Sequence, residues 1–436
     1  MTCETMLMNL EGVALAADGA VTLIDMAGDH MVVRLSQSGV KKVFLLQEEG
    51  PIGVMIYNGA QFGGLPWKTV FETYRTFAAP PATVPDAVRS LRDFLSVSGS
   101  VMDPNKRLPV SKDTDLANLV HFIDATVMHY TSILERHAAA VEELGVKDLP
   151  GVHQDGLEQL ALEVSRDFEY LGDQAILREG APERAKVGTP TRAFEQLLAS
   201  YLEPLLKEIL SRRLGKASGG ADVLKRLHGI VETALVTDWI PPGAVYTGLV
   251  VTGFGRDEVS PGYVNLEVLG SIGGVLKHRV VDAYRTTGDR PSSVESFAMN
   301  GPVQAFLDGA RPEFRLQAYS ATVDELIQRL KPVMERVARK DPALAAEVED
   351  DLVEAIFEAP ARGLGNAVRA HWDNVSSNLV LSVRSLPASG LGENAARLLR
   401  LAVLEHELTG NRTVSKPITI LEMSKGRYRF IDDPQL

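Results

Sequence analysis

Residues 2–19 read TCETMLMNLEGVALAADG, and this stretch decides the fold prediction. A turn signal at Glu11-Gly12 divides two apolar runs, and the second run ends in Asp18. Polar residues interrupt the apolar character and no basic region precedes it, so the stretch does not fit a signal peptide. We interpret it as a pair of buried strands that ends in a carboxylate.

The composition is that of a globular protein. The chain has 436 residues, of which 45% are hydrophobic and 23% charged, with a formal net charge of −12. Such an acidic balance disfavours nucleic-acid partners. Cys3 is the one cysteine, which excludes an intrachain disulfide and a thiolate metal cluster. No apolar run reaches the roughly 18–20 residues of a membrane span, so we expect a soluble cytoplasmic protein without membrane partners.

Strand-like and helix-like patterns alternate in large blocks. Residues 1–60 are rich in short β-type runs, and helical periodicity dominates 99–238 before β-type runs return near 246–284. Further helical patterns follow, and the chain closes with a predicted helix and hairpin. This order predicts an α+β core with long helical insertions. The expected division is a core of 1–98, 239–310 and 388–436, with insertions at 99–238 and 311–387.

Thr2 stands directly behind the initiator Met. Removal of Met1 would give a threonine whose hydroxyl is a nucleophile and whose own α-amine, with a pKa near 8, can accept the hydroxyl proton. A threonine at this position is also common and can mean only that Met1 is removed efficiently. Position alone therefore leaves both interpretations open.

A lysine in the apolar run 40–46 is the second candidate for chemistry. Neighbouring strand residues point to opposite faces, so either Lys41 or Lys42 should point inward if both faces of the strand are covered. A buried lysine requires a partner such as Asp18, and its charge would lower the pKa values of the Thr2 hydroxyl and amine. The alternative is that both lysines are charges that protect an edge strand.

At these residues the chain resembles proteasome β-subunits and the related bacterial protease subunit. The separation of Thr2 from Asp18 is similar to the family's separation of catalytic threonine and acid, and the run 40–44 (VKKVF) resembles its lysine strand, with the catalytic lysine at Lys42. About eight extra residues lie between Asp18 and Lys42. The run 57–60 (YNGA) resembles the turn whose backbone N–H forms the oxyanion hole, which implies that role for Gly59.

Later segments follow the family's order as well. The stretches 249–255 (LVVTGFG), 297–302 (FAMNGP), 404–411 (LEHELTGN) and 417–420 (PITI) are similar to its remaining core segments. Asn300 stands where active members usually carry a supporting serine, His406 stands where they carry an aspartate, and Thr409 takes a serine position. The resemblance implies supporting roles for these three residues, with the N-terminal amine tuned differently.

The resemblance implies a four-layer αββα N-terminal-nucleophile hydrolase fold. The implied activity is threonine-type hydrolysis of peptide or other amide bonds, without a cofactor or metal. It also implies a homo-oligomer, either a ring or a stacked dimer, with an unfoldase or adaptor as a further partner. Two alternatives stay open: a catalytically inactive scaffold or regulatory subunit, which the Asn300 and His406 departures favour, and a non-proteolytic amidohydrolase acting on a small substrate.

Overall fold

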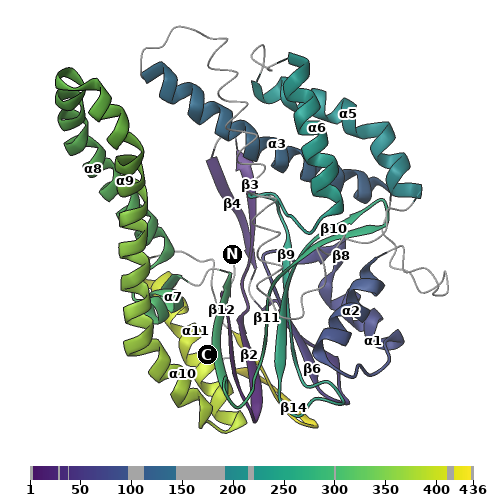
Figure 1. The fold of residues 1–436 in the computed structure, drawn as a ribbon. Helices are drawn as coiled ribbons and strands as arrows, with labels where there is room; N and C mark the ends of the chain where they lie inside the picture. Colours follow the sequence, from purple (N-terminus) through teal and green to yellow (C-terminus); the bar gives the residue numbers. More distant parts are fainter. Residues whose placement is uncertain are drawn as a thin grey trace. The chain divides into compact units, whose positions relative to one another are not determined.

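The computed structural model describes most of the chain. The described residues are 3–27, 30–37, 39–96, 112–143, 192–214, 220–298, 301–409 and 417–433. They form helices and antiparallel sheets (Figure 1), which confirms the α+β class predicted from the block pattern. Among these residues, no helix is both long enough and apolar enough to cross a membrane.

The strands and helices follow one another in the predicted blocks. The strands are β1 (Cys3–Asn9), β2 (Gly12–Asp18), β3 (Val21–Ala27), β4 (His30–Gln37), β5 (Val43–Gln47), β6 (Ile52–Tyr57), β7 (Gln61–Phe62), β8 (Leu65–Pro66), β9 (Thr247–Gly253), β10 (Gly262–Ile272), β11 (Val275–Arg285), β12 (Ser292–Ala298), β13 (Ile418–Ser424) and β14 (Arg427–Asp433). The helices are α1 (Trp67–Phe77), α2 (Val84–Leu95), α3 (Lys112–Glu143), α5 (Arg192–Leu214), α6 (Gly220–Val236), α7 (Gly301–Asp308), α8 (Pro312–Lys340), α9 (Pro342–His371), η3 (Trp372–Ser376), α10 (Ser377–Arg384) and α11 (Ala388–Thr409).

By packing, the chain divides into two compact units. One comprises 1–43, 259–261 and 285–436, and the other comprises 44–258 and 262–284. The predicted division into one core with two insertions stays a prediction.

The first unit is built on a five-stranded sheet in the order β12-β1-β2-β13-β14. Each neighbouring pair in it is antiparallel. Every residue of β1 and β2 is buried, as apolar runs without strict alternation predict for a strand covered on both faces. Helix α11 packs on β1, β2 and β13, and the small side chains Ala14 and Ala16 of β2 belong to that core.

Asn9 organises the turn between β1 and β2. Its Oδ1 accepts hydrogen bonds from the backbone nitrogens of Glu11 (2.9 Å) and Gly12 (3.0 Å), which is how an Asx side chain closes a tight turn. Its Nδ2 donates to the carbonyls of Val383 and Leu386 at 2.9 and 2.7 Å. One buried amide therefore sets the hairpin and ties it to the segment that precedes α11.

Strands β3 and β4, between Asp18 and Lys42, form a separate two-stranded ribbon. Val40 donates its backbone N–H to the carbonyl of Gly19 at 3.0 Å, which closes the base of the ribbon. The chain therefore leaves the first sheet just after Asp18, and Val40 comes back beside Gly19 just before Lys42. An insertion of this kind lengthens the loop without separating its two ends.

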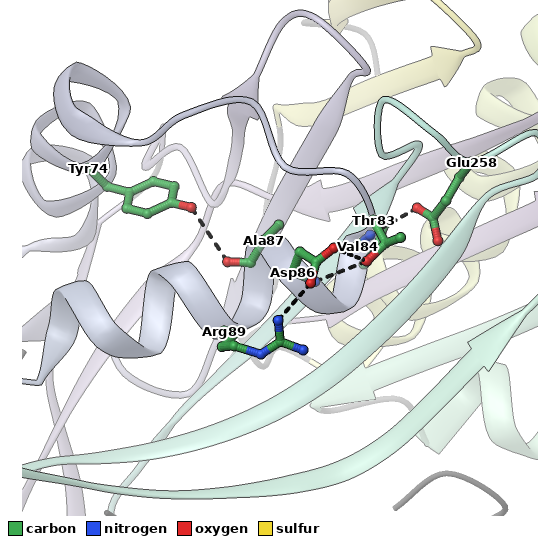
Figure 2. Close-up of polar contacts among 7 residues, drawn as sticks. All are labelled: Tyr74, Thr83, Val84, Asp86, Ala87, Arg89 and Glu258. Carbon is green, nitrogen blue, oxygen red and sulfur yellow. Dashed lines mark hydrogen bonds and ion pairs between the residues drawn. The ribbon is translucent and has the colours of Figure 1, made fainter.

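The second unit has a five-stranded sheet in the order β11-β10-β9-β6-β5, with α1 and α2 packed on it in one apolar core. Helix α2 begins after the N-cap Thr83, whose Oγ1 accepts from the Asp86 nitrogen at 3.2 Å. Buried Glu258 accepts from the backbone nitrogen of Val84 at 2.9 Å (Figure 2). It also accepts from the nitrogen of Gly255 at 2.8 Å, and so links the helix start to the loop after β9.

Helices α3, α5 and α6 form a second apolar cluster in this unit, together with Ile272 and Val275. Lys277 of β11 is buried within it and caps the C-terminal end of α6. Its Nζ donates to the carbonyl of Ala234 at 2.5 Å and to the carbonyl of Thr237, and lies 5.0 Å from the ring centroid of Phe122. Burial lowers the pKa of Lys277 from 10.5 to about 7.

Lys277 should make stability depend on pH. Between its folded pKa of about 7 and its ordinary 10.5, the unfolded chain holds a proton that the folded chain does not, so stability should rise with pH. We expect the difference in unfolding free energy between wild type and Lys277→Met to increase from pH 7 to 9, by at most about 1.4 kcal/mol per pH unit. Urea titrations at each pH measure it, and a flat or falling difference would contradict the assignment.

Candidate functional site

Asp18 lies where the end of β2 meets the start of β1. The antiparallel register pairs Glu4 with Ala17, which brings the first residues of β1 beside the last residue of β2. The Asp18 carboxylate accepts from the backbone nitrogen of Cys3 at 3.1 Å through Oδ1 and from that of Ala20 at 2.9 Å through Oδ2. The amide held at Oδ1 is the one that joins Cys3 to Thr2.

Lys42 completes a buried ion pair with Asp18. Its Nζ lies 2.6 Å from Asp18 Oδ1, and the side chains are only 2% and 0% exposed. Strand β5 begins at Val43, so Lys42 lies directly before this strand and not inside it. At this point the chain has just closed the base of the β3-β4 ribbon through Val40. Lys41 is exposed instead, with Nζ 3.9 Å from the ring centroid of Phe430. Of the two lysines, Lys42 is the inward one.

The pair concentrates charge around the start of β1. Removing two ions from water is costly, and a pair this deeply buried persists only where further hydrogen bonds satisfy the carboxylate. Asp18 has these bonds from Cys3 and Ala20. Burial raises the pKa of the Cys3 thiol well above its ordinary value, and the nearby charges of Glu4 and Asp18 raise it further. Cys3 is therefore a protonated, buried thiol and a poor nucleophile.

Gly59 follows β6 in a tight three-residue turn. Its backbone N–H donates to the carbonyl of Tyr57 at 2.9 Å, and Asn58 between them has a φ of 63°. The Tyr246 hydroxyl is hydrogen-bonded to Asn58 and to buried Glu267; burial, and then the charge of Glu267, raises the pKa of Tyr246. In this structure the N–H expected to bind an oxyanion is thus engaged within its own turn.

Gly59 is also confined by its neighbours. A Cβ added there would overlap Oγ1 of Thr247, which in turn accepts from Trp67 Nε1 at 3.2 Å. We expect Gly59→Ala to lower the free energy of unfolding by about 1–3 kcal/mol, as overpacking in a rigid site does. The matched control is Gly288→Ala, where a Cβ would meet open space. Denaturant titrations compare the two variants. Equal free energies of unfolding would show that the turn at Gly59 accommodates the added Cβ without cost.

A second backbone feature lies next to Cys3. Ala298, the last residue of β12, is the register partner of Cys3 and has a φ of 61°. This left-handed conformation costs an alanine roughly 1–2 kcal/mol. Strained residues of this kind concentrate at functional sites, where the surrounding structure holds them. Ala298 therefore marks the same end of β1 as the ion pair does.

Several of the predicted site residues have no described side chain. Thr2 and Asn300 are outside the described residues. The backbones of His406 and Thr409 belong to α11, but their side chains are not described. The part of this site whose side chains are described is therefore the Asp18–Lys42 pair, together with the backbone N–H groups that donate to Asp18. Across the described ranges, no group of three or more His, Cys, Asp or Glu side chains is arranged to hold a metal ion.

Sequence patterns do not indicate Ala298, Tyr246 or Glu267. A left-handed alanine has no sequence signature, and Tyr246 and Glu267 meet Asn58 only through the fold. The sequence does single out Glu4, as a carboxylate inside an apolar run, and this residue is fully buried in β1.

Compared with protein-family models, with curated proteins and with solved structures, the chain shows no match.

Proposed function

We propose that this protein is a threonine-type N-terminal-nucleophile hydrolase, similar to proteasome β-subunits, that cleaves peptide or other amide bonds. The observation that carries the proposal is the buried Asp18–Lys42 pair, with its 2.6 Å contact. The carboxylate of this pair also holds the Cys3 amide, one peptide bond from Thr2. Such a catalyst requires a hydroxyl nucleophile with a cation and a carboxylate close to it, and Thr2, Lys42 and Asp18 are the proposed three.

The two sheets are compatible with the proposed fold. Each has five strands, and helices pack on each of them, α11 on one and α1 with α2 on the other. A four-layer αββα sandwich is built from two units of this kind. We include that arrangement in the proposal, together with a homo-oligomeric assembly, a cytoplasmic location, and an unfoldase or adaptor as a further partner.

In the proposed reaction, loss of Met1 frees the α-amine of Thr2. Thr2 Oγ attacks the substrate carbonyl while the amine takes the hydroxyl proton. The proton then passes to the leaving amine as the C–N bond breaks, and water hydrolyses the resulting ester. Lys42 stabilises the developing negative charge at Oγ, and Asp18 holds Lys42 in place. No cofactor is required.

The turn at Gly59 favours a second candidate, a catalytically inactive scaffold or regulatory subunit. The Gly59 N–H already donates to Tyr57, so it could bind an oxyanion only if the turn opened. Asn300 and His406, at positions where active members of the family that this chain resembles usually carry Ser and Asp, favour the same candidate. In that case the Asp18–Lys42 pair is purely structural.

Intact mass and peptide hydrolysis together test the proposal. The chain is expected to lack Met1 by mass spectrometry and to release the fluorophore from at least one member of a panel of short fluorogenic peptide amides. Retention of Met1 would block the amine and contradict the hydrolase assignment. A chain that lacks Met1 and cleaves no member of the panel would support the scaffold.

A further inference from the structure

Helices α8 and α9 form a long antiparallel hairpin with little core of its own. They lie side by side within the first unit (Figure 1), joined at Asp341, which ends α8 and accepts from the Leu344 nitrogen at 3.1 Å as the N-cap of α9. Each spans about 45 Å at 1.5 Å per residue. Among the side chains described, Val323 is the buried one on α8 and Ile356 the buried one on α9.

Helix α8 carries a heptad row of large side chains. Alternating steps of three and four residues connect Leu316, Tyr319, Val323, Leu326, Leu330, Val333 and Val337. This spacing is the seam of a coiled coil, whose members are normally covered by a partner helix. Within this row Leu316 is 69% exposed and Val333 is 41% exposed. Ile327 lies beside the row, three turns from Leu316 on the same side, and is 39% exposed. Helix α9 therefore covers the row only in part.

The charges of the hairpin change sign along each helix. Residues 312–326 contain three acidic and one basic residue, whereas 327–340 contain five basic and one acidic residue. In α9, residues 342–358 contain six acidic residues and no basic one, and 359–371 contain Arg362, Arg369 and His371 without an acidic residue. The pattern suits the helix dipoles and the contact between the two helices. On the side of α8 that carries Leu316 and Ile327, Glu313 lies toward the N-terminal end and Lys331 toward the C-terminal end. Antiparallel packing of two copies therefore sets Glu313 of each against Lys331 of the other.

We propose that the exposed side of α8 docks against the same side of α8 in a second copy of this chain, antiparallel across a two-fold axis. Such an interface is self-complementary: each residue pair occurs twice, and Glu313 of each α8 faces Lys331 of the other. Leu316 and Ile327 become covered, and two hairpins form a four-helix bundle. This dimer is independent of the proposed hydrolase and would form with or without Met1.

Sedimentation velocity on the full chain tests the proposal at roughly 1–100 µM, where modest interfaces associate. Wild type is expected to approach twice its mass of 47.3 kDa as concentration rises. Leu316→Glu with Ile327→Glu should weaken the dimer by at least about 100-fold. Both positions are exposed, so circular dichroism should show unchanged helicity. The control Leu404→Glu, exposed on α11, should leave the dimer intact.

A charge exchange gives a second, independent readout. Variant A carries Lys331→Glu and variant B carries Glu313→Lys, two exposed positions one helical turn from Ile327 and Leu316 on the same side of α8. Each variant alone sets like charges against each other across the two-fold and should dissociate, whereas an equimolar mixture should restore a heterodimer. A wild type that stays monomeric over the whole range would overturn the proposal. So would an oligomer that survives Leu316→Glu with Ile327→Glu, since its contacts lie elsewhere.

Discussion

Asp18→Asn and Lys42→Met are each expected to lower the free energy of unfolding by about 3–5 kcal/mol, because each leaves the other partner as an uncompensated buried charge. The pair is almost wholly removed from solvent, with a 2.6 Å contact. The double variant should cost much less than the sum of the two single changes, since it leaves no unpaired ion. Denaturant unfolding of the four proteins completes the cycle.

The matched control for this cycle is an exposed pair. Arg329 and Glu325 are 2.5 Å apart on α8, with side chains that are 76% and 55% exposed, so Arg329→Ala should change stability by no more than about 0.5 kcal/mol. If the single changes at Asp18 and Lys42 cost as little as this control, the pair is not buried as described. A strictly additive cycle would show that the two groups do not interact.

Thr2→Ala is expected to reduce hydrolysis by at least about 10³-fold, because it removes the proposed nucleophile and leaves the amine without a hydroxyl to activate. Thr2→Ser is the matched control, since it keeps both groups and should retain a measurable part of the rate. Both variants keep a small residue behind Met1. Initial rates on whichever fluorogenic amide the wild type cleaves measure the effect. Activity that survives in Thr2→Ala would place the nucleophile elsewhere.

Local patterns predicted much of the fold. Strands β1 and β2 and the turn between them follow from apolar runs divided at Glu11-Gly12, and the buried Asp18 follows from its position at the end of the second run. Helical periodicity predicted the blocks that contain α3, α5 and α9. These features depend on residues close in sequence, where period and turn chemistry act directly.

The parts that patterns could not predict depend on distant contacts. The choice between Lys41 and Lys42 is made by the ribbon closure that returns the chain to Asp18, 24 residues earlier. The engagement of the Gly59 N–H depends on the left-handed Asn58, and the strain at Ala298 on its pairing with Cys3. The incomplete cover of α8 also becomes visible only once α9 has been placed beside it. None of these follows from local propensity.

The most direct test of the central claim is the chemistry of the first residue. A peptide epoxyketone requires a hydroxyl and a free amine on one residue, so wild type treated with it should gain one inhibitor mass. Tandem mass spectrometry should map that mass to Thr2, and Thr2→Ala should gain nothing. An adduct on Cys3, or no adduct on a chain that has lost Met1, would contradict the assignment of Thr2 as the nucleophile.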